Sequence, residues 1–230
     1  MQRISEAFTW PFRDPKWVEK VVIIGLIGLI PIIGQLNNLG WMLAAIDRLR
    51  AGEEQLPPAN FDYLLRGLQL FLVLLVYGLV IVAVASVFFV PAVIVLNTQS
   101  GEHGNGLLIA IGVLLLLLAF AIALIGILVL FALRAAIVLA VDQRGMEGGF
   151  DIGGILRRLR AAPADALIAG LMLIAAGFIG SLGAYVLCLV GTIFTIPYSL
   201  AMEAWIVRSY EIGSKPEEAS DVGKSAPATG

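Results

Sequence analysis

Two blocks of this chain run for more than 25 residues without a charged side chain, and they constrain its fold more than any other feature. They cover residues 67–96 and 107–133. As helices that rise about 1.5 Å per residue, both are longer than the roughly 30 Å hydrocarbon core of a bilayer. A third apolar block, 164–207, is too long for one crossing and divides near residues 180–183 into two segments joined by a tight turn. With 60% hydrophobic and 14% charged residues, the chain is predicted to be an all-α, polytopic membrane protein with four spanning helices.

The basic residues predict how these helices are oriented. The loop 97–106 contains no lysine or arginine, and neither does the turn around residues 180–191. Basic loops stay on the cytoplasmic side, so we expect residues 47–66, residues 134–163 and both termini to be cytoplasmic, in the inner membrane. All fifteen bases then lie on one side: Arg3, Arg13, Lys16, Lys20, Arg48, Arg50, Arg66, Arg134, Arg144, Arg157, Arg158, Arg160, Arg208, Lys215 and Lys224.

Residues 21–46 must therefore cross the bilayer an even number of times. The apolar stretch 21–34 and the shorter stretch 39–46 flank Asn37 and Asn38, and neither reaches across about 30 Å of hydrocarbon. We expect a re-entrant helical hairpin that turns between Gly34 and Gly40, with the two asparagines serving backbone groups left unpaired by the turn. The alternative is one kinked, tilted span with Pro31 at the kink, which violates the charge rule.

The remaining segments are short and polar or amphipathic. Residues 1–20 place Ile4, Phe8 and Phe12 four residues apart and are predicted to lie on the membrane surface as an amphipathic segment. Residues 21–212 form the transmembrane helical domain. Residues 213–230 are small, polar and proline-containing, which is typical of a disordered tail.

The sequence contains almost nothing that enzyme chemistry requires. It has no phosphate-binding glycine loop, no HExxH and no CxxC motif. His103, the only histidine, lies in a short external loop, and the single cysteine, Cys188, lies within an apolar block. A net charge of −2 without a basic stripe argues against nucleic acid as a partner. We therefore expect no catalytic residues, no metal and no cofactor.

Polar side chains at membrane depth are the remaining candidates for a site. A charged group left at the centre of the bilayer costs about 2.5–3.5 kcal/mol on insertion scales. Glu203 lies inside the last span and is a candidate intramembrane polar site together with Asn37 and Asn38. It either binds a proton or a cation, or pairs with an arginine near the interface. Arg134 is predicted to mark the end of the block 107–133, with its guanidinium reaching the headgroups.

A stripe of small residues predicts close helix packing. Ala176, Gly180 and Ala184 are spaced four residues apart, which lets helix backbones approach closely in lipid. The stripe either packs within the chain or forms an interface with another subunit, and the first interpretation is favoured.

Several segments resemble a family of prokaryotic multi-spanning membrane proteins known as domain of unknown function 4013. They are "DPKW", "IGLIGLIPIIG", "LPPANFDYLLRGLQLFLVLLVYGL" and "VGTIFTIPYSLAMEAWIVRSY". The similarity covers roughly residues 5–212, although Pro58, Ala59 and Asn60 stand where the family pattern has proline and tryptophan. The resemblance implies a helical membrane architecture and supplies no activity and no catalytic residues.

Two functions remain open from the sequence. The favoured one is a non-enzymatic accessory or scaffold subunit that packs against lipid and against other membrane subunits or itself. The alternative is a small-solute or ion transporter or channel, with a broken-helix site near Asn37, Asn38 and Glu203. An enzyme that acts on lipid is a distant third.

Overall fold

The computed structural model describes residues 4–101 and 104–214, without the side chains of 4, 182–184 and 186–190, and all regular elements in this part are helical. The all-α prediction is thus confirmed for the described residues. Two short 3₁₀ helices precede six α-helices. The elements are η1 (Ile4–Phe8), η2 (Trp10–Arg13), α1 (Trp17–Gly28), α2 (Ile33–Arg50), α3 (Leu64–Thr98), α4 (Gly106–Phe150), α5 (Ile152–Ala161) and α6 (Pro163–Gly213).

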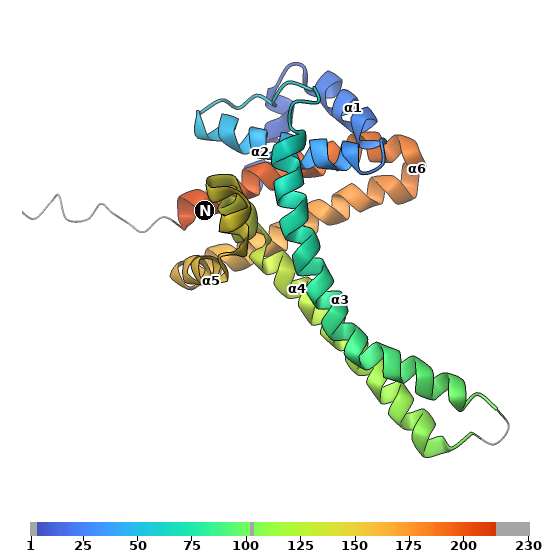
Figure 1. The fold of residues 1–230 in the computed structure, drawn as a ribbon. Helices are drawn as coiled ribbons and strands as arrows, with labels where there is room; N and C mark the ends of the chain where they lie inside the picture. The colour runs from blue at the N-terminus through green and yellow to red at the C-terminus, as the bar shows by residue number, and fades with distance from the viewer. Residues whose placement is uncertain (1–3, 102–103, 215–230) are drawn as a thin grey trace, which may run out of the picture.

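Three segments are long and apolar enough to cross a membrane, as the apolar blocks predicted. They are α3, α4 and the first part of α6, Pro163–Ser181. Figure 1 shows α1, α2, α5 and α6 gathered around one end of a long hairpin formed by α3 and α4. The chain is therefore a membrane protein with a helical body and a projecting helix pair.

The projecting part of this hairpin is here named the arm and comprises residues 78–129. Its described residues take no part in the hydrophobic core of the body, which ends at Tyr77 on α3 and Leu130 on α4. The two helices instead pack on each other, since a Cβ at Gly126 would lie 2.8 Å from Ile81 and one at Gly112 would lie 2.8 Å from Leu96. Most of the large apolar side chains on both helices of the arm are exposed.

Helix α4 continues well past the end of its apolar block. The sequence predicted that the block ends at Arg134, but helical backbone continues to Gly145, where φ is 65° and ψ is −153°. These angles lie in a region that only glycine adopts readily. Gly145 therefore ends the straight part of α4 and redirects the chain toward α5.

Helices α1 and α2 form a helical hairpin, but its turn is not where the sequence placed it. The turn covers residues 29–32 rather than 34–40, and Asn37 and Asn38 lie inside α2. Ile32 has a φ of 64° and a ψ of −64°, and the Ile33 amide donates to the Pro31 carbonyl at 2.7 Å, so the reversal is a γ-turn. Gly34 is needed for close contact of the two helices, because a Cβ there would lie 2.0 Å from the Ile27 carbonyl oxygen.

The outer ends of this hairpin meet at a single carbonyl group. Lys20 Nζ near the start of α1 donates to the Leu56 carbonyl at 2.5 Å, and Arg48 Nη1 near the end of α2 donates to the same oxygen at 3.1 Å. The end of α2 therefore lies close to the start of α1. The loop after α2 joins both ends of the hairpin.

Helix α6 folds back on itself, as its length predicted. Thr195 Oγ1 donates to the Gly180 carbonyl at 2.9 Å, although fifteen residues of straight helix would separate the two groups by about 22 Å. The reversal lies between these two residues (Figure 1). Two antiparallel segments of α6 thus stand where the sequence predicted two segments joined by a turn.

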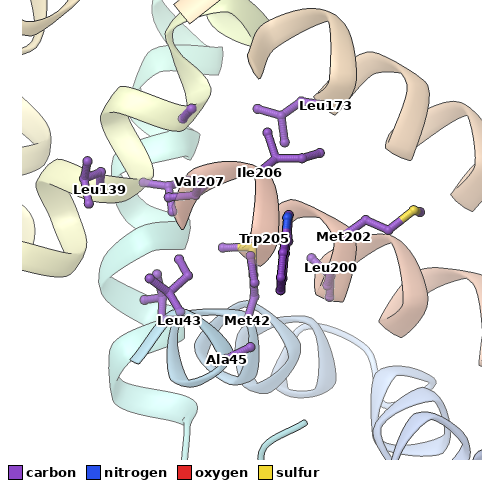
Figure 2. Close-up of a cluster of buried hydrophobic side chains, with 14 of the residues drawn as sticks. Met42, Leu43, Ala45, Leu139, Leu173, Leu200, Met202, Trp205, Ile206 and Val207 are labelled. Atoms are coloured by element: carbon purple, nitrogen blue, oxygen red, sulfur yellow. The ribbon is translucent and has the colours of Figure 1, made fainter. Parts of the chain in front are cut away.

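The core of the body lies where α2, α4 and α6 meet. Met42 and Leu43 of α2, Leu139 of α4, and Trp205 and Ile206 of α6 are all buried there (Figure 2). The second segment of α6 is the centre of this core, since other helices surround it. Close helix approach is achieved by glycine, because a Cβ at Gly67 of α3 would lie 1.7 Å from the Leu36 carbonyl oxygen of α2.

The N-terminal segment packs against the body. The Trp10 side chain is fully buried, donates from Nε1 to the Ala201 carbonyl at 3.0 Å and stacks on Trp205 with ring centroids 5.7 Å apart. Phe12, in contrast, is about half exposed. That residues 1–20 also rest on the bilayer surface stays a prediction. Of the predicted tail at 213–230, residues 215–230 lie outside the described part.

Candidate functional site

Glu203, the main candidate of the sequence analysis, is paired with Arg134. The Arg134 guanidinium of α4 donates from Nε to Oε1 at 2.6 Å and from Nη2 to Oε2 at 3.0 Å of the Glu203 carboxylate on α6. The Glu203 side chain is 8% exposed and that of Arg134 is 25% exposed. This two-point geometry uses both carboxylate oxygens and is the strongest form of such a pair. Arg134 therefore points at Glu203 rather than at the headgroups.

The ion pair borders a cavity of about 260 Å³ between α2, α4 and α6. Asn38 and Gln35 of α2 line the cavity together with Ala176 and Ser199 of α6. The structure therefore brings two of the three candidate polar residues, Asn38 and Glu203, to one site, along with one residue of the predicted packing stripe.

Asn37 and Asn38 form hydrogen bonds with backbone groups of two different segments. Asn37 faces away from the cavity, where its Nδ2 donates to the Asn60 carbonyl at 2.8 Å and its Oδ1 accepts from the Tyr63 amide at 3.4 Å. Asn38, in the amide orientation that satisfies both of its polar atoms, donates to the Ile24 carbonyl at 3.1 Å and to the Gly34 carbonyl at 3.2 Å. The two side chains thus join α2 to the start of α3 and to α1, and they do not serve the turn.

The small-residue stripe packs within the chain as far as it is described. Ala176 is buried, and a Cβ at Gly180 would lie 3.0 Å from Ser199 Oγ on the returning segment of α6. The side chain of Ala184 lies outside the described residues. The first two positions thus lie against segments of the same chain, and the role of the stripe as a helix-packing face stays a prediction.

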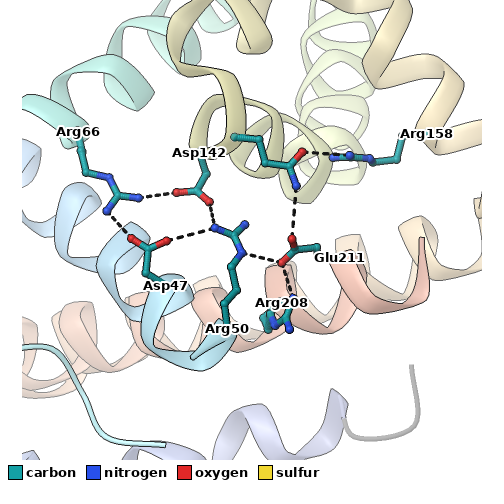
Figure 3. Close-up of polar contacts among 8 residues, drawn as sticks. Asp47, Arg50, Arg66, Asp142, Arg158, Arg208 and Glu211 are labelled. Atoms are coloured by element: carbon teal, nitrogen blue, oxygen red, sulfur yellow. Dashed lines mark hydrogen bonds and ion pairs between the residues drawn. The ribbon is translucent and has the colours of Figure 1, made fainter. Parts of the chain in front are cut away.

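A second polar cluster, here named the charged network, joins α2, α3, α4, α5 and α6 (Figure 3). Asp142 of α4 has no exposed side-chain surface and contacts two arginines, with Arg66 Nη2 at 2.7 Å and Arg50 in direct contact. Arg50 also donates to Glu211 at 3.0 Å. Asp47 accepts from Arg66 at 2.5 Å and from Arg50 at 3.2 Å. The other contacts run from Arg208 to Glu211 at 2.7 Å, from Gln143 to Glu211 at 3.4 Å and from Arg158 to Gln143 at 3.1 Å.

The N-terminal segment has a buried carboxylate of its own. Asp14 is 2% exposed and accepts from Lys20 Nζ at 2.6 Å, from the Lys16 amide at 2.8 Å and from the Leu56 amide at 3.0 Å. Burial by itself raises the pKa of Asp14, but these donors outweigh it, the lysine first, and the pKa lies below its ordinary value. Asp14 is therefore a charged anchor for the start of α1.

Sequence reasoning missed the partner of Glu203 and the extent of the charged network. One signal was available, because Arg134 directly follows one apolar block, Glu203 lies within another, and the two opposite charges would each be costly alone. The described residues contain no group of three or more His, Cys, Asp or Glu side chains that could hold a metal ion. His103 and the side chain of Cys188 lie outside the described part, and the absence of catalysis stays a prediction.

The helices and their internally paired charges define the class of this chain as a polytopic α-helical membrane protein. Its particular family follows from residues 23–189, which match the family described as "Protein of unknown function (DUF4013)". The match covers well over half of the chain, and the chain belongs to that family, as the resemblance indicated. No curated protein and no solved structure matches it.

Proposed function

We propose that this protein is a non-enzymatic accessory or scaffold subunit of an inner-membrane complex. The observation that carries the proposal is the arm, which projects from the body and offers apolar surface on both of its helices. In contrast, the candidate polar residues Asn37, Asn38 and Glu203 are all hydrogen-bonded within the chain. Such an arrangement leaves the arm as the part of the molecule best placed to recognise another membrane protein.

A groove along the arm supports a protein neighbour. Its volume is about 340 Å³, and Gly78, Ala85, Ala119 and Ala123 keep it open between larger side chains such as Phe89. Helices in lipid gain little from further burial of apolar surface and associate by close packing at small residues. A groove with a small-residue floor is therefore suited to a helix of another subunit.

We further propose four crossings, a re-entrant α1–α2 hairpin and cytoplasmic termini. Three predicted cytoplasmic segments supply the charged network. Arg50 and Arg66 come from 47–66, Arg158 from 134–163 and Arg208 from the C-terminal group. The described ends of the loop after α3, which contains no lysine or arginine, lie at the far end of the arm (Figure 1). Helix α1 is only about 18 Å long, and the shared Leu56 contact of Lys20 and Arg48 supports a hairpin that leaves on the side of entry.

Cysteine labelling tests this topology. In a Cys188→Ser background, a cysteine placed at Gln55 should resist an impermeant reagent applied to intact cells, and one placed at Gln99 should react with it. Both should react after the cells are opened. Labelling of the residue-55 reporter in intact cells contradicts the re-entrant hairpin.

Filling the groove tests the scaffold role. Ala85→Phe and Ala123→Phe place bulk in the groove, whereas Val84→Phe and Leu124→Phe enlarge exposed side chains of the arm outside its lining. After gentle extraction, native mass spectrometry should show a defined foreign subunit on the wild type and on the second pair. The first pair should lose it. If the wild type carries only lipid, the scaffold proposal is wrong.

The cavity beside Glu203 is the one observation that favours the transport alternative. It contains polar groups of Gln35, Asn38 and Ser199 next to a carboxylate. Proteoliposomes loaded with a pH dye or a potassium dye would then show flux that falls on Glu203→Gln. Flux in the wild type that this variant abolishes, while the variant stays folded, establishes transport in place of the scaffold role.

A further inference from the structure

Helix α5 has two sides of opposite character that other helices cover only in part. Asp151 caps its start by accepting from the Gly154 amide at 2.8 Å, and Ile155 is buried against the body. Ile152 and Leu156 are exposed, and they project from the same side of the helix because they are four residues apart. Such a short amphipathic helix is suited to the boundary between headgroups and acyl chains.

Two arginines on α5 form no hydrogen bond or ion pair in the described part of the chain, although the charge of Arg157 acts on the nearby Asp151 carboxylate. Arg144 pairs with Asp151 at 2.9 Å, and Arg158 donates to Gln143 at 3.1 Å. Arg157 and Arg160, in contrast, make neither a hydrogen bond nor an ion pair with the described residues, and both are exposed. Their positive charge is therefore available to an external anion.

A cavity lined by one of these two residues, Arg157, can accommodate a headgroup. It measures about 370 Å³, lies between α4, α5 and α6, and is lined by Arg144, Arg157 and Arg158. The acids at its edge are already engaged, Asp151 by Arg144 and Glu211 by two other arginines. Basic cavities beside membrane helices are typical binding sites for anionic headgroups.

We propose that α5 and this cavity bind the phosphate headgroup of an anionic phospholipid. Arg157 and Arg160 supply the charge, and Ile152 and Leu156 insert among the acyl chains. The occupant is a lipid rather than a soluble anion because exposed apolar side chains flank the arginines. In the topology proposed above, this lipid belongs to the cytoplasmic leaflet, but the binding itself does not depend on that orientation.

Native mass spectrometry of the full chain tests this site. The protein is titrated in neutral detergent micelles with dioctanoyl phosphatidylglycerol and, separately, with dioctanoyl phosphatidylcholine. The wild type should retain one or more molecules of phosphatidylglycerol at concentrations at which no phosphatidylcholine adduct is observed. Each arginine near an anionic lipid contributes about fivefold in affinity. Arg157→Gln should therefore weaken phosphatidylglycerol binding about fivefold, and the double variant Arg157→Gln/Arg160→Gln should weaken it about 25-fold.

Lys16→Gln is the matched control, because it removes one exposed positive charge away from α5. Its affinity should stay within about twofold of the wild type, and all variants should keep their melting temperature. Equal retention of the two lipids, unchanged binding by the double variant, or an equal loss in Lys16→Gln overturns the proposal. Millimolar inorganic phosphate that displaces the lipid completely would identify a site for a free anion instead.

Discussion

The ion pair between Arg134 and Glu203 makes the sharpest prediction about what this polar site does. Glu203→Gln keeps the size of the side chain but leaves the Arg134 charge without its two-point partner beside the cavity. The double change Arg134→Leu/Glu203→Leu removes both charges and leaves apolar side chains in their place. The two variants separate the cost of an uncompensated charge from the worth of the pair.

The expected magnitudes differ in size and in sign. Removing one partner of a buried pair costs about 3–5 kcal/mol, whereas replacing both with apolar groups is neutral or stabilising by about 1–4 kcal/mol. Because 25% of the Arg134 side chain is exposed, the pair is only partly buried, and we expect Glu203→Gln to cost about 3 kcal/mol, at the lower end of that range. The double variant should be at least as stable as the wild type.

Reversible unfolding in mixed detergent and dodecyl sulfate micelles measures these differences, with tryptophan fluorescence as the signal, because Trp205 lies two residues from Glu203. Glu19→Gln on the exposed side of α1 is the control and should change stability by less than about 0.5 kcal/mol. A Glu203→Gln variant as stable as this control would refute the structural role of the pair. It would then favour a site that exists for transport.

Three further predictions concern the packing of the body. Gly67→Ala should lower the free energy of unfolding by about 1–3 kcal/mol or more, because the added Cβ would clash with backbone atoms of α2. The control is Gly78→Ala on the same helix, whose Cβ would meet nothing within 4 Å and which should be neutral in the same unfolding assay. Ile32→Gly should raise the free energy of unfolding by about 1 kcal/mol in urea or dodecyl sulfate titration, because glycine adopts the positive φ of this position without strain. A loss of stability would contradict the γ-turn. The pKa of Asp14 is lower in the folded protein than in the unfolded chain. Its contribution to the stability of the folded protein is therefore complete above the unfolded-state pKa of about 4, and it is lost as the pH falls through the lower pKa of the folded state. Limited proteolysis before Lys20 should therefore increase at low pH, and Asp14→Asn should show that increase already at pH 7.

The apolar blocks predicted the helices well because burial in lipid depends on composition and length. Helices α3 and α4 and the first part of α6 follow from long hydrophobic sequence, since the backbone must satisfy its own hydrogen bonds in hydrocarbon. The end of α4 was less predictable. Arg134 was expected at the interface, but its pairing with Glu203 allows helix to continue around a charge that would otherwise be costly.

Contacts distant in sequence could not be predicted in this way. Glu203 and Arg134 are 69 residues apart, and the hydrogen bond from Trp10 to Ala201 joins residues 191 apart. The turn between α1 and α2 was misplaced because Gly34 and Gly40 suggested local flexibility. In the structure these glycines permit close contact, since a Cβ at Gly40 would lie 2.0 Å from the Tyr63 carbonyl oxygen.

The distribution of polar contacts explains why the arm projects alone. On α3, the contacts to the body lie near the start of the helix, where Gly67 meets α2 and Arg66 bonds to Asp47 and Asp142. On α4 they lie after Leu130, from Arg134 to the hydrogen bond that Tyr77 makes with the Gly149 carbonyl at 2.9 Å. The network can thus fix the direction of the arm without touching its surface. If the arm binds another subunit as proposed, selectivity for that subunit must come from the shape of the arm groove, because apolar surface alone does not distinguish a protein helix from lipid.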